Sequence, residues 1–129
     1  MKGITSNSRE VKPGYTFVAI KGTQLDGEQY IANAIENGAT RIVVEESSQV
    51  QLEGVEVLRV ANTRVALSDL ASDFYPKRPS NIVAVTGTNG KTSTAYFYKQ
   101  LCSLAKNKSA SIGTLGIYAD DMEFDNKDA

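Results

Sequence analysis

Residues 82–93 read Ile-Val-Ala-Val-Thr-Gly-Thr-Asn-Gly-Lys-Thr-Ser and join a β-branched run to a helical pattern through a glycine-containing loop. Gly87 and Gly90 allow the loop backbone conformations that other residues rarely adopt. The loop amides can then converge on an anion at the N-terminus of the following helix, where free N–H groups and the helix dipole favour negative charge. The order of strand, loop, Lys91 and Thr92 therefore predicts a site for nucleotide phosphates.

The two residues that follow the loop carry the predicted chemistry. Lys91 is expected to reach the β- and γ-phosphates, and the Thr92 hydroxyl is expected to hold Mg²⁺. The general pattern G-x-x-x-x-G-K-[ST] is matched incompletely, because its first glycine would fall at Val85 and the chain has Gly87 instead. The alternative is a strand–turn–helix joint that uses glycines only for its turn. The Lys-Thr pair favours phosphate binding.

The composition is typical of a soluble globular protein. The chain has 129 residues, 41% hydrophobic and 22% charged, with a formal net charge of −1, so one ordinary domain or two small ones are expected. This balance indicates neither a nucleic-acid partner nor membrane insertion, and no apolar run approaches the roughly 20 residues of a spanning helix. The sequence has no histidine, which excludes histidine catalysis within it, and only one cysteine, Cys102. With no signal peptide visible after Met1, the cytoplasm is the expected compartment.

The first part of the chain alternates strand and helix patterns. β-branched and aromatic runs predict strands, and apolar residues at helical spacing predict helices. The predicted strands cover residues 15–20, 41–44 and 55–60, and the predicted helices cover residues 29–37 and a segment capped by Asn62 with the apolar stripe Leu67, Leu70, Ala71 and Phe74. Pro76-Lys77-Arg78-Pro79 ends the second helix, so a boundary between domains 1–79 and 80–129 is expected.

The loop at residues 21–27 leaves the first predicted strand and is bounded by glycines. Its hydrogen-bonding side chains make it a candidate ligand contact, because loops at strand ends often carry function. On composition alone, a plain connection between strand and helix is the favoured interpretation.

The second part of the chain contains few predicted strands. The patterns predict a strand over residues 81–86, a helix over about 92–105, a parallel strand over 109–112 and a tight turn at 113–116. Residues 117–118 and 122–124 are expected to form a hairpin. A doubly wound sheet needs further strands, so the faces of this unit are expected to be open and the unit incomplete. The nearby carboxylates are better explained as a solvated surface than as a metal site: Asp120, Asp121, Glu123, Asp125 and Asp128.

Several motifs resemble those of the Mur ligases, the ATP-dependent amide-forming enzymes of peptidoglycan precursor synthesis. The phosphate loop at residues 86–92 has that family's glycine at position 87, which accounts for the missing earlier glycine. The turn at residues 113–116, Gly-Thr-Leu-Gly, is similar to that of the family member that adds the third amino acid. The other matches are Asn7-Ser8-Arg9 with Pro13-Gly14 and Phe17-Val18-Ala19, and Gly22-Thr23-Gln24-Leu25-Asp26-Gly27 with the helix after it.

The resemblance implies an α/β fold. A small N-terminal α/β UDP-binding domain would be followed by the first strand, phosphate loop, helix and strand of a parallel-sheet ATPase domain. Ser8, with its neighbour Ser6, would contact the uracil end of a UDP-sugar, and the loop would line the same pocket with Thr23, Gln24 and Leu25. Two positions depart from the family pattern: Asn7, where Asp is usual, and Thr23, where histidine is common.

The resemblance also implies an ATP and Mg²⁺ site in the second domain. Lys91 would act on the transferred phosphoryl group as the catalytic residue, and Thr92 would bind Mg²⁺. The residues implied to bind ATP are Gly87, Thr88, Asn89, Gly90, Lys91, Thr92 and Ser93.

The reaction implied by the resemblance forms an amide through an acyl phosphate. ATP phosphorylates a carboxylate of UDP-N-acetylmuramoyl-L-alanyl-D-glutamate, and the amine of an amino acid, diaminopimelate or L-lysine, displaces phosphate. The protein contributes positioning and charge stabilisation to such chemistry. In the family the remaining parts of the site come later in the chain, so this chain alone is expected to be inactive. The amino acid added and the oligomeric state stay open.

Three alternatives remain at this point. One is a non-catalytic module that holds a UDP-sugar or a nucleotide. Another is the sister ligase that adds D-Ala-D-Ala, although its phosphate loop usually has Ser at the position of Thr88. A third is an unrelated phosphate-loop protein such as a small kinase, which the motifs before Pro76 disfavour.

Overall fold

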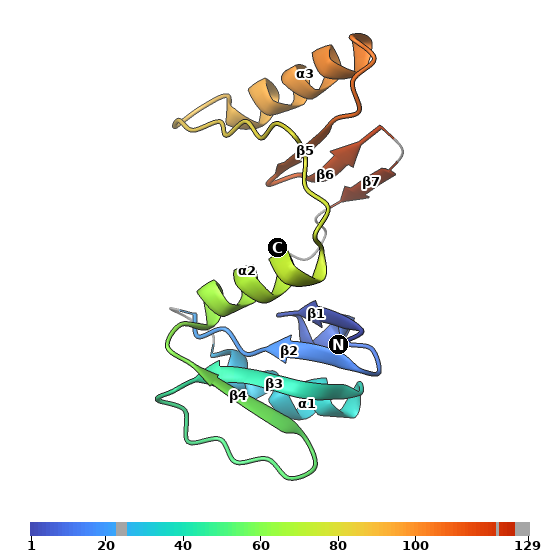
Figure 1. Cartoon of the computed structure of the whole chain (residues 1–129). Coiled ribbons are helices and arrows are strands. Elements are labelled where there is room, and N and C mark those ends of the chain that lie inside the picture. The colour runs from blue at the N-terminus through green and yellow to red at the C-terminus, as the bar shows by residue number, and fades with distance from the viewer. Residues whose placement is uncertain (23–25, 121, 126–129) are drawn as a thin grey trace. The chain divides into compact units, whose positions relative to one another are not determined.

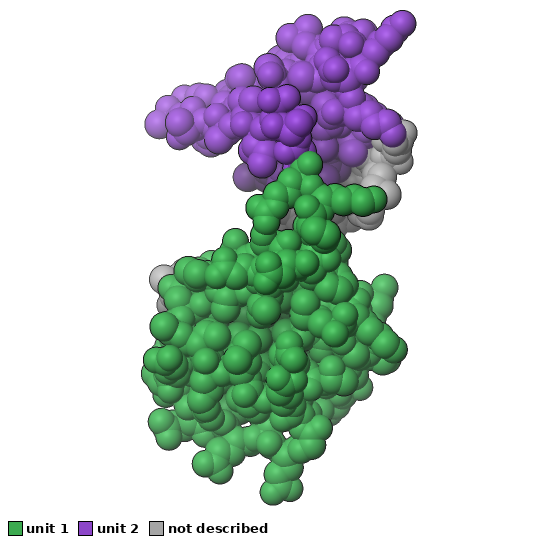
Figure 2. Space-filling model, viewed as in Figure 1, with its two compact units in different colours: residues 1–78 green, residues 79–129 purple. Residues whose placement is uncertain are grey.

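The computed structural model describes residues 1–22, 26–120 and 122–125 of the chain. The chain divides into two compact units, Met1–Arg78 and Pro79–Ala129, coloured separately in Figure 2. Each unit has its own secondary structure, so each is described by itself. Both contain helices and strands, which confirms the α/β class.

Unit 1 is built on a four-stranded parallel sheet in the order β1-β2-β3-β4 (Figure 1). Its central pairs place Phe17 beside Ile42 and Ile42 beside Val57, so β-branched and aromatic side chains line up across neighbouring strands. The strands predicted from the sequence are confirmed, and β1 is an additional short strand. The bounds are β1 Gly3–Thr5, β2 Tyr15–Val18, β3 Ala39–Glu45 and β4 Glu56–Val60.

Helices cover the sheet of unit 1 on both faces. On one face, Phe17 and Ile42 pack in a buried cluster with Ile31 and Ala34 of α1 (Ile31–Glu36). Val18 and Val43, which alternate with these residues along β2 and β3, are fully buried and point to the other face. That face is covered by α2 (Thr63–Phe74), which contacts β1 and β3 (Figure 1). Burial on both sides is a property of β2 and β3, whose segments Phe17–Val18 and Ile42–Val44 are continuously apolar.

The helix ends of unit 1 follow the sequence signals. Asn62 caps α2, its side-chain oxygen accepting from the N–H groups of Arg64 and Val65 at 2.9 and 3.1 Å. Gly38 ends the turn after α1 with a φ of +97°, and it accepts at 2.9 Å from the N–H of Gly14, which has a φ of +87°. This hydrogen bond joins the Pro-Gly turn before β2 to the turn that follows α1. A short 3-10 helix, η1 (Ser8–Glu10), connects β1 to this turn.

Unit 2 contains one long helix and a three-stranded antiparallel sheet in the order β5-β6-β7 (Figure 1). The predicted helix, tight turn and hairpin are confirmed. Two predictions are wrong: residues 81–86 form no strand, and the strand near 109–112 is antiparallel to β6 instead of part of a parallel sheet. The bounds are α3 Lys91–Leu104, β5 Ala110–Gly113, β6 Gly116–Ala119 and β7 Met122–Asp125.

The physical reason for both corrections is the lack of neighbours. A strand is defined by hydrogen bonds to an adjacent strand, and β5 makes its bonds to β6 across the tight turn at residues 114–115. Ile82 and Ile112 remain 80% and 78% exposed, and the described part of unit 2 buries no large apolar side chain. The open faces expected from the sequence are confirmed.

Candidate functional site

The phosphate loop has the backbone geometry that its glycines allow. Gly87 and Gly90 have φ values of +145° and +74°, a region that side chains other than glycine rarely adopt. Gly90 is the N-cap of α3 and brings no side-chain hydrogen bond to its first turn. The N-terminal amides of α3 therefore retain the donor capacity and the positive end of the helix dipole that favour an anion.

The two residues after the loop begin α3, as expected. The Lys91 Nζ atom donates to the carbonyl oxygen of Gly87 at 2.5 Å and lies 3.5 Å from that of Thr88. The Thr92 hydroxyl is on a half-buried residue, whereas Lys91 and Ser93 are exposed. Thr88 and Asn89, between the two glycines, are exposed, as is Gly90. The structure thus brings all the predicted phosphate-binding residues together around one helix end.

The donor set at this helix end fits Mg²⁺ bound together with phosphates. Mg²⁺ keeps several waters and takes few protein ligands when a nucleotide supplies phosphate oxygens, so one hydroxyl, that of Thr92, is a sufficient contribution here. In the described part of the chain, no group of three or more carboxylate, cysteine or histidine side chains converges on a common point. An all-protein metal cage is therefore not the arrangement that these residues offer.

Two of the predicted UDP-sugar residues, Ser6 and Ser8, lie between the carboxyl end of β1 and the start of β2 in unit 1. Ser6 follows β1 directly and is exposed, whereas Ser8 is 7% exposed in η1. The Ser8 carbonyl oxygen accepts from the Asn37 side chain at 2.9 Å, which ties η1 to the end of α1. Ligands of parallel sheets gather at the carboxyl edge because the strand ends and their loops meet there.

The loop after β2 leaves the same edge and is held closed at its base. Lys21 and Asp26 form an antiparallel bridge, and the N–H of Gly27 donates to the carbonyl oxygen of Ile20 at 3.0 Å. A Cβ atom on Gly27 would lie 2.6 Å from the Ile20 backbone, so only glycine fits this neck. Three predicted contact residues, Thr23, Gln24 and Leu25, lie outside the described residues.

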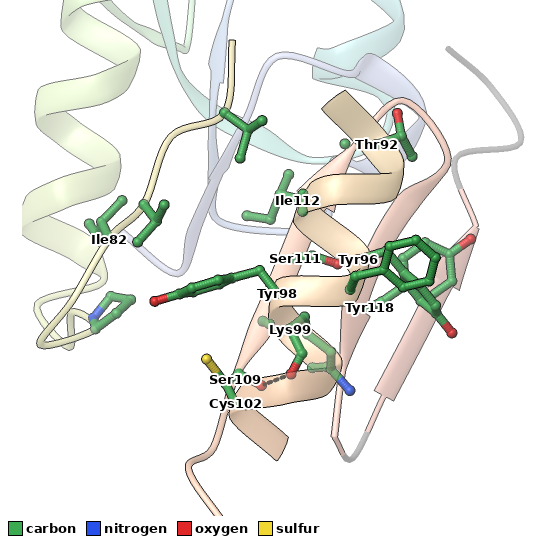
Figure 3. A pocket seen from close by; sticks show the side chains of 18 of the residues that line it. Ile82, Thr92, Tyr96, Tyr98, Lys99, Cys102, Ser109, Ser111, Ile112 and Tyr118 are labelled. Atoms are coloured by element: carbon green, nitrogen blue, oxygen red, sulfur yellow. Dashed lines mark hydrogen bonds between the residues drawn. The ribbon is translucent and has the colours of Figure 1, made fainter. Parts of the chain in front are cut away.

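Unit 2 also contains an open hollow of about 1770 Å³, seen from close by in Figure 3. It lies between the extended segment that carries Ile82, the face of α3 that carries Tyr98, and β5 with Ile112. This volume exceeds the roughly 300–1,000 Å³ of typical small-molecule pockets, and its walls are largely apolar and exposed. Its lining also includes Lys91, Thr92 and Ser93, so one part of the hollow adjoins the phosphate loop, and much of the rest is an uncovered apolar face.

A polar cluster at the other end of α3 was not predicted. The Asp120 carboxylate lies 2.7 Å from Lys99 Nζ and 2.6 Å from the Ser103 hydroxyl, and it accepts from the N–H of Ser109 at 3.1 Å. The bond from Lys99, followed by those from Ser103 and Ser109, lowers the pKa of Asp120 from 3.8 to about 2. Asp120 is exposed, as expected of a solvated surface, but its carboxylate is also bonded by residues that are distant in sequence.

None of the helices in the described part of the chain is both long and apolar enough to cross a bilayer.

Residues 1–75 match the family described as Mur ligase family, catalytic domain, and residues 85–129 match the Mur ligase middle domain. The two matches fall on unit 1 and unit 2 respectively. The match over residues 85–129 contains all of the phosphate loop.

Curated relatives cover nearly the whole chain. A UDP-N-acetylmuramoyl-L-alanyl-D-glutamate–2,6-diaminopimelate ligase of Mesorhizobium japonicum is 46% identical over 117 residues, which is 91% of this chain and 24% of that protein. A ligase of the same name, numbered 2, from Clostridium acetobutylicum is 39% identical over 95% of this chain and 26% of its own length. The chain thus spans about a quarter of the length of these relatives.

Solved structures agree with the sequence matches. A structure of a UDP-N-acetylmuramoyl-L-alanyl-D-glutamate–2,6-diaminopimelate ligase superposes with a TM-score of 0.71 at 25% identity, over 95% of this chain and 26% of that one. The MurF ligase of Thermotoga maritima in complex with ADP superposes with a TM-score of 0.61 at 33% identity, over 78% of this chain and 23% of that one.

Proposed function

Because the chain belongs to the Mur ligase family, we propose that it is the N-terminal portion of an ATP-dependent ligase of peptidoglycan precursor synthesis. The parent protein would add the third amino acid to UDP-N-acetylmuramoyl-L-alanyl-D-glutamate through an acyl phosphate. The names of the relatives at 39–46% identity support 2,6-diaminopimelate as that amino acid. The sister ligase that adds D-alanyl-D-alanine is the second candidate, supported by structures that are 28–33% identical.

The single observation that carries the proposal is the phosphate loop at the start of α3. ATP bound there would supply the phosphoryl group that activates a substrate carboxylate. Lys91 would exchange the loop carbonyl oxygens for phosphate oxygens, and Thr92 would place Mg²⁺ beside them. The backbone N–H groups of residues 87–93 would bind the remaining phosphate oxygens at the positive end of the helix dipole.

Unit 1 would hold the UDP end of the sugar substrate. Ser6 and the described base of the loop, Lys21 and Asp26, follow the carboxyl ends of β1 and β2, where such a ligand is expected. Ser8, Thr23, Gln24 and Leu25 are proposed as further contacts on the family resemblance. The partners of the parent protein would be this UDP-sugar dipeptide and an amino acid in the cytoplasm, with no nucleic acid and no membrane insertion.

We further propose that these 129 residues bind ligands without completing the reaction. The chain spans about a quarter of the relatives, and the described part of unit 2 buries no large apolar side chain. A packed and water-excluding environment is what makes electrostatic catalysis effective, and this unit does not supply one.

A calorimetric titration of the chain tests the proposal. UDP-N-acetylmuramoyl-L-alanyl-D-glutamate is titrated first and Mg-ATP second, into the wild-type chain, Lys91→Ala and the matched control Lys108→Ala. Lys108 is an exposed lysine of the same unit outside the loop. The expected result is UDP-sugar binding by all three proteins, and Mg-ATP binding by the wild type and Lys108→Ala only.

Two outcomes would contradict the proposal separately. A folded chain that does not bind the UDP-sugar dipeptide overturns the assignment of unit 1. Mg-ATP binding that is equally tight in Lys91→Ala overturns the assignment of the phosphate loop, since a lysine on the phosphates contributes directly to affinity.

A further inference from the structure

Helix α3 carries the phosphate loop at its N-terminus, yet little apolar packing holds it. The helix has 14 residues, and isolated helices shorter than about 12–15 residues are marginal in water. Its apolar side chains Phe97, Leu101 and Leu104 are 61%, 63% and 80% exposed. Something other than a core must therefore keep α3 in place in this unit.

The polar cluster around Asp120 supplies such an attachment. One oxygen of the Asp120 carboxylate meets Lys99 and Ser103 of α3, and the other accepts from the N–H of Ser109 just before β5. Asp120 itself follows β6 directly, so one carboxylate joins the helix to both strands of the β5–β6 hairpin. The Lys99 side chain is 15% exposed and the Asp120 side chain 30%, and bonds to an ionised group are stronger than neutral ones.

The two serines close the cluster. The Ser109 hydroxyl donates to the Lys99 carbonyl oxygen at 3.0 Å, the bond drawn as a dashed line in Figure 3, and it lies 3.1 Å from the Ser103 hydroxyl. Lys99 is thus held by its backbone and by its side chain at once. A cluster that satisfies its members from three segments defines one arrangement of those segments.

An aromatic contact also joins α3 to the hairpin. The rings of Tyr96 and Tyr118 meet edge to face with centroids 5.7 Å apart, as Figure 3 shows. Tyr96 is 40% exposed, so this pair gains less from burial than a core pair does. The Asp120 cluster makes several bonds to three segments, whereas the aromatic pair is a single contact between two.

We propose that Asp120 is a positioning residue, which holds α3 on the β5–β6 hairpin through Lys99, Ser103 and Ser109 and so keeps the phosphate-loop end of the helix ordered. The effect at the phosphate loop rests on the proposed nucleotide site. The effect on the helix does not. Because helix formation is cooperative, release of the second half of α3 also lowers the population of its first turn.

The test measures amide hydrogen exchange in the full chain without nucleotide. Variants Asp120→Asn and Lys99→Met remove one charge each, Lys108→Met is the matched control, and Tyr96→Ala tests the aromatic contact. We expect exchange of the α3 amides to become about tenfold faster or more in the first two variants. Exchange of β3 in unit 1 is expected to stay unchanged in every variant, which shows that unit 1 remains folded.

The conservative variant Lys99→Arg separates positioning from a general loss of structure. Arginine keeps the charge and donates to the same carboxylate, so slow exchange of α3 is expected to return. Mg-ATP titrations of the same proteins are expected to show affinity reduced about tenfold in Lys99→Met and restored in Lys99→Arg.

Several results would overturn the inference. They are a wild-type α3 with no exchange protection, equal protection in wild type and Lys99→Met, an equal loss in Lys108→Met, or a loss in Tyr96→Ala alone. A wild-type chain that fails to bind Mg-ATP contradicts the proposed function instead, and the exchange data then still decide whether Asp120 holds the helix.

Discussion

The ammonium group of Lys91 lies 2.5 Å from the carbonyl oxygen of Gly87, so the lysine is folded back over its own loop. This contact lies across the loop residues that would face a bound phosphate group. The geometry indicates that the loop is largely preformed, because the glycines already have positive φ values and the lysine is already directed to their side of the helix end. Preorganisation of this kind reduces the ordering entropy that binding would otherwise cost.

Thr92→Val is expected to remove the Mg²⁺ dependence of ATP binding. Valine has nearly the shape of threonine but no hydroxyl, so the helix start is retained while the proposed metal ligand is lost. In the wild type, Mg²⁺ is expected to tighten ATP binding about tenfold or more, and in Thr92→Val this gain should vanish. Fluorescence titrations with and without Mg²⁺ measure it. Thr94→Val, on the same helix, is the control, and an equal loss there would contradict the role of Thr92.

The two linked glycines of unit 1 are predicted to differ in their tolerance of alanine. Both have positive φ values, but a Cβ on Gly38 would lie 2.9 Å from the Pro13 backbone, whereas a Cβ on Gly14 would meet only the flexible Lys2 side chain. We expect Gly38→Ala to lower the free energy of unfolding of unit 1 by ~3 kcal/mol and Gly14→Ala by ~1 kcal/mol. Urea denaturation followed by circular dichroism checks this order, and the reverse order would refute it.

We predict that asparagine at position 7 is more stabilising here than aspartate, because Glu10 lies beside it. Its side-chain oxygen accepts from the N–H of Arg9 at 3.1 Å, and its amide lies 3.4 Å from the Glu10 carboxylate. Asn7→Asp keeps the cap but places two carboxylates together, so a loss of ~0.5 kcal/mol in unfolding free energy is expected. In a Glu10→Gln background the same change should be neutral. A double-mutant cycle by urea denaturation measures the coupling, and a zero coupling would rule it out.

Lys106→Gly is expected to stabilise α3. Lys106 has a φ of +61°, and the N–H groups of Lys106 and Asn107 donate to the carbonyl oxygens of Ser103 and Cys102 at 2.9 Å each. This is the helix ending in which glycine is the favoured residue. Relief of the left-handed conformation, less the added freedom of the unfolded chain, is worth about 0.5–1 kcal/mol. Amide exchange of α3 should slow accordingly, and faster exchange would contradict the prediction.

Unit 2 is predicted to lose part of its stability as the pH falls from about 4 toward 2. The bonds to Asp120 lower its pKa from 3.8 to about 2. Because the folded-state pKa is depressed, the stabilising contribution is fully present above about pH 4 and is lost as the pH falls toward 2. A carbon-detected NMR titration of the Asp120 carboxyl measures this pKa, which Lys99→Met should raise toward 3.8. A wild-type pKa near 3.8 would contradict the prediction.

Much of unit 1 follows from local sequence patterns. The runs at residues 15–20, 41–44 and 55–60 are confirmed as strands, and the β-branched residues of the first two are buried between two helical layers. Asn62 caps the start of α2, and Gly38 follows the end of α1, both where predicted. Such signals can be read from the sequence because a cap or a positive φ value depends on a single residue. The short strand β1 was missed, because three residues carry too little periodicity to indicate a strand.

Unit 2 shows what local patterns leave undecided. Residues 81–86 have the composition of a buried strand, yet a strand exists only where a neighbour accepts its hydrogen bonds. Asp120 and Lys99 are 21 residues apart, and no local signal joins them. Their pairing depends on the register of β5 and β6, which places Ala110 opposite Ala119 and so brings Ser109 and Asp120 together one position further.

The sequence by itself determined three of the four strands of unit 1, the helix ends, and the order of glycine loop, Lys91 and Thr92 that predicts phosphate binding. These features depend on residue types at fixed short spacings, which local physical chemistry dictates. Only the tertiary structure decided that residues 82–85 stay unpaired and that a carboxylate holds α3 to the hairpin. Those outcomes depend on which distant segments become neighbours, because hydrogen bonds and ion pairs form only between groups that the fold has already brought together.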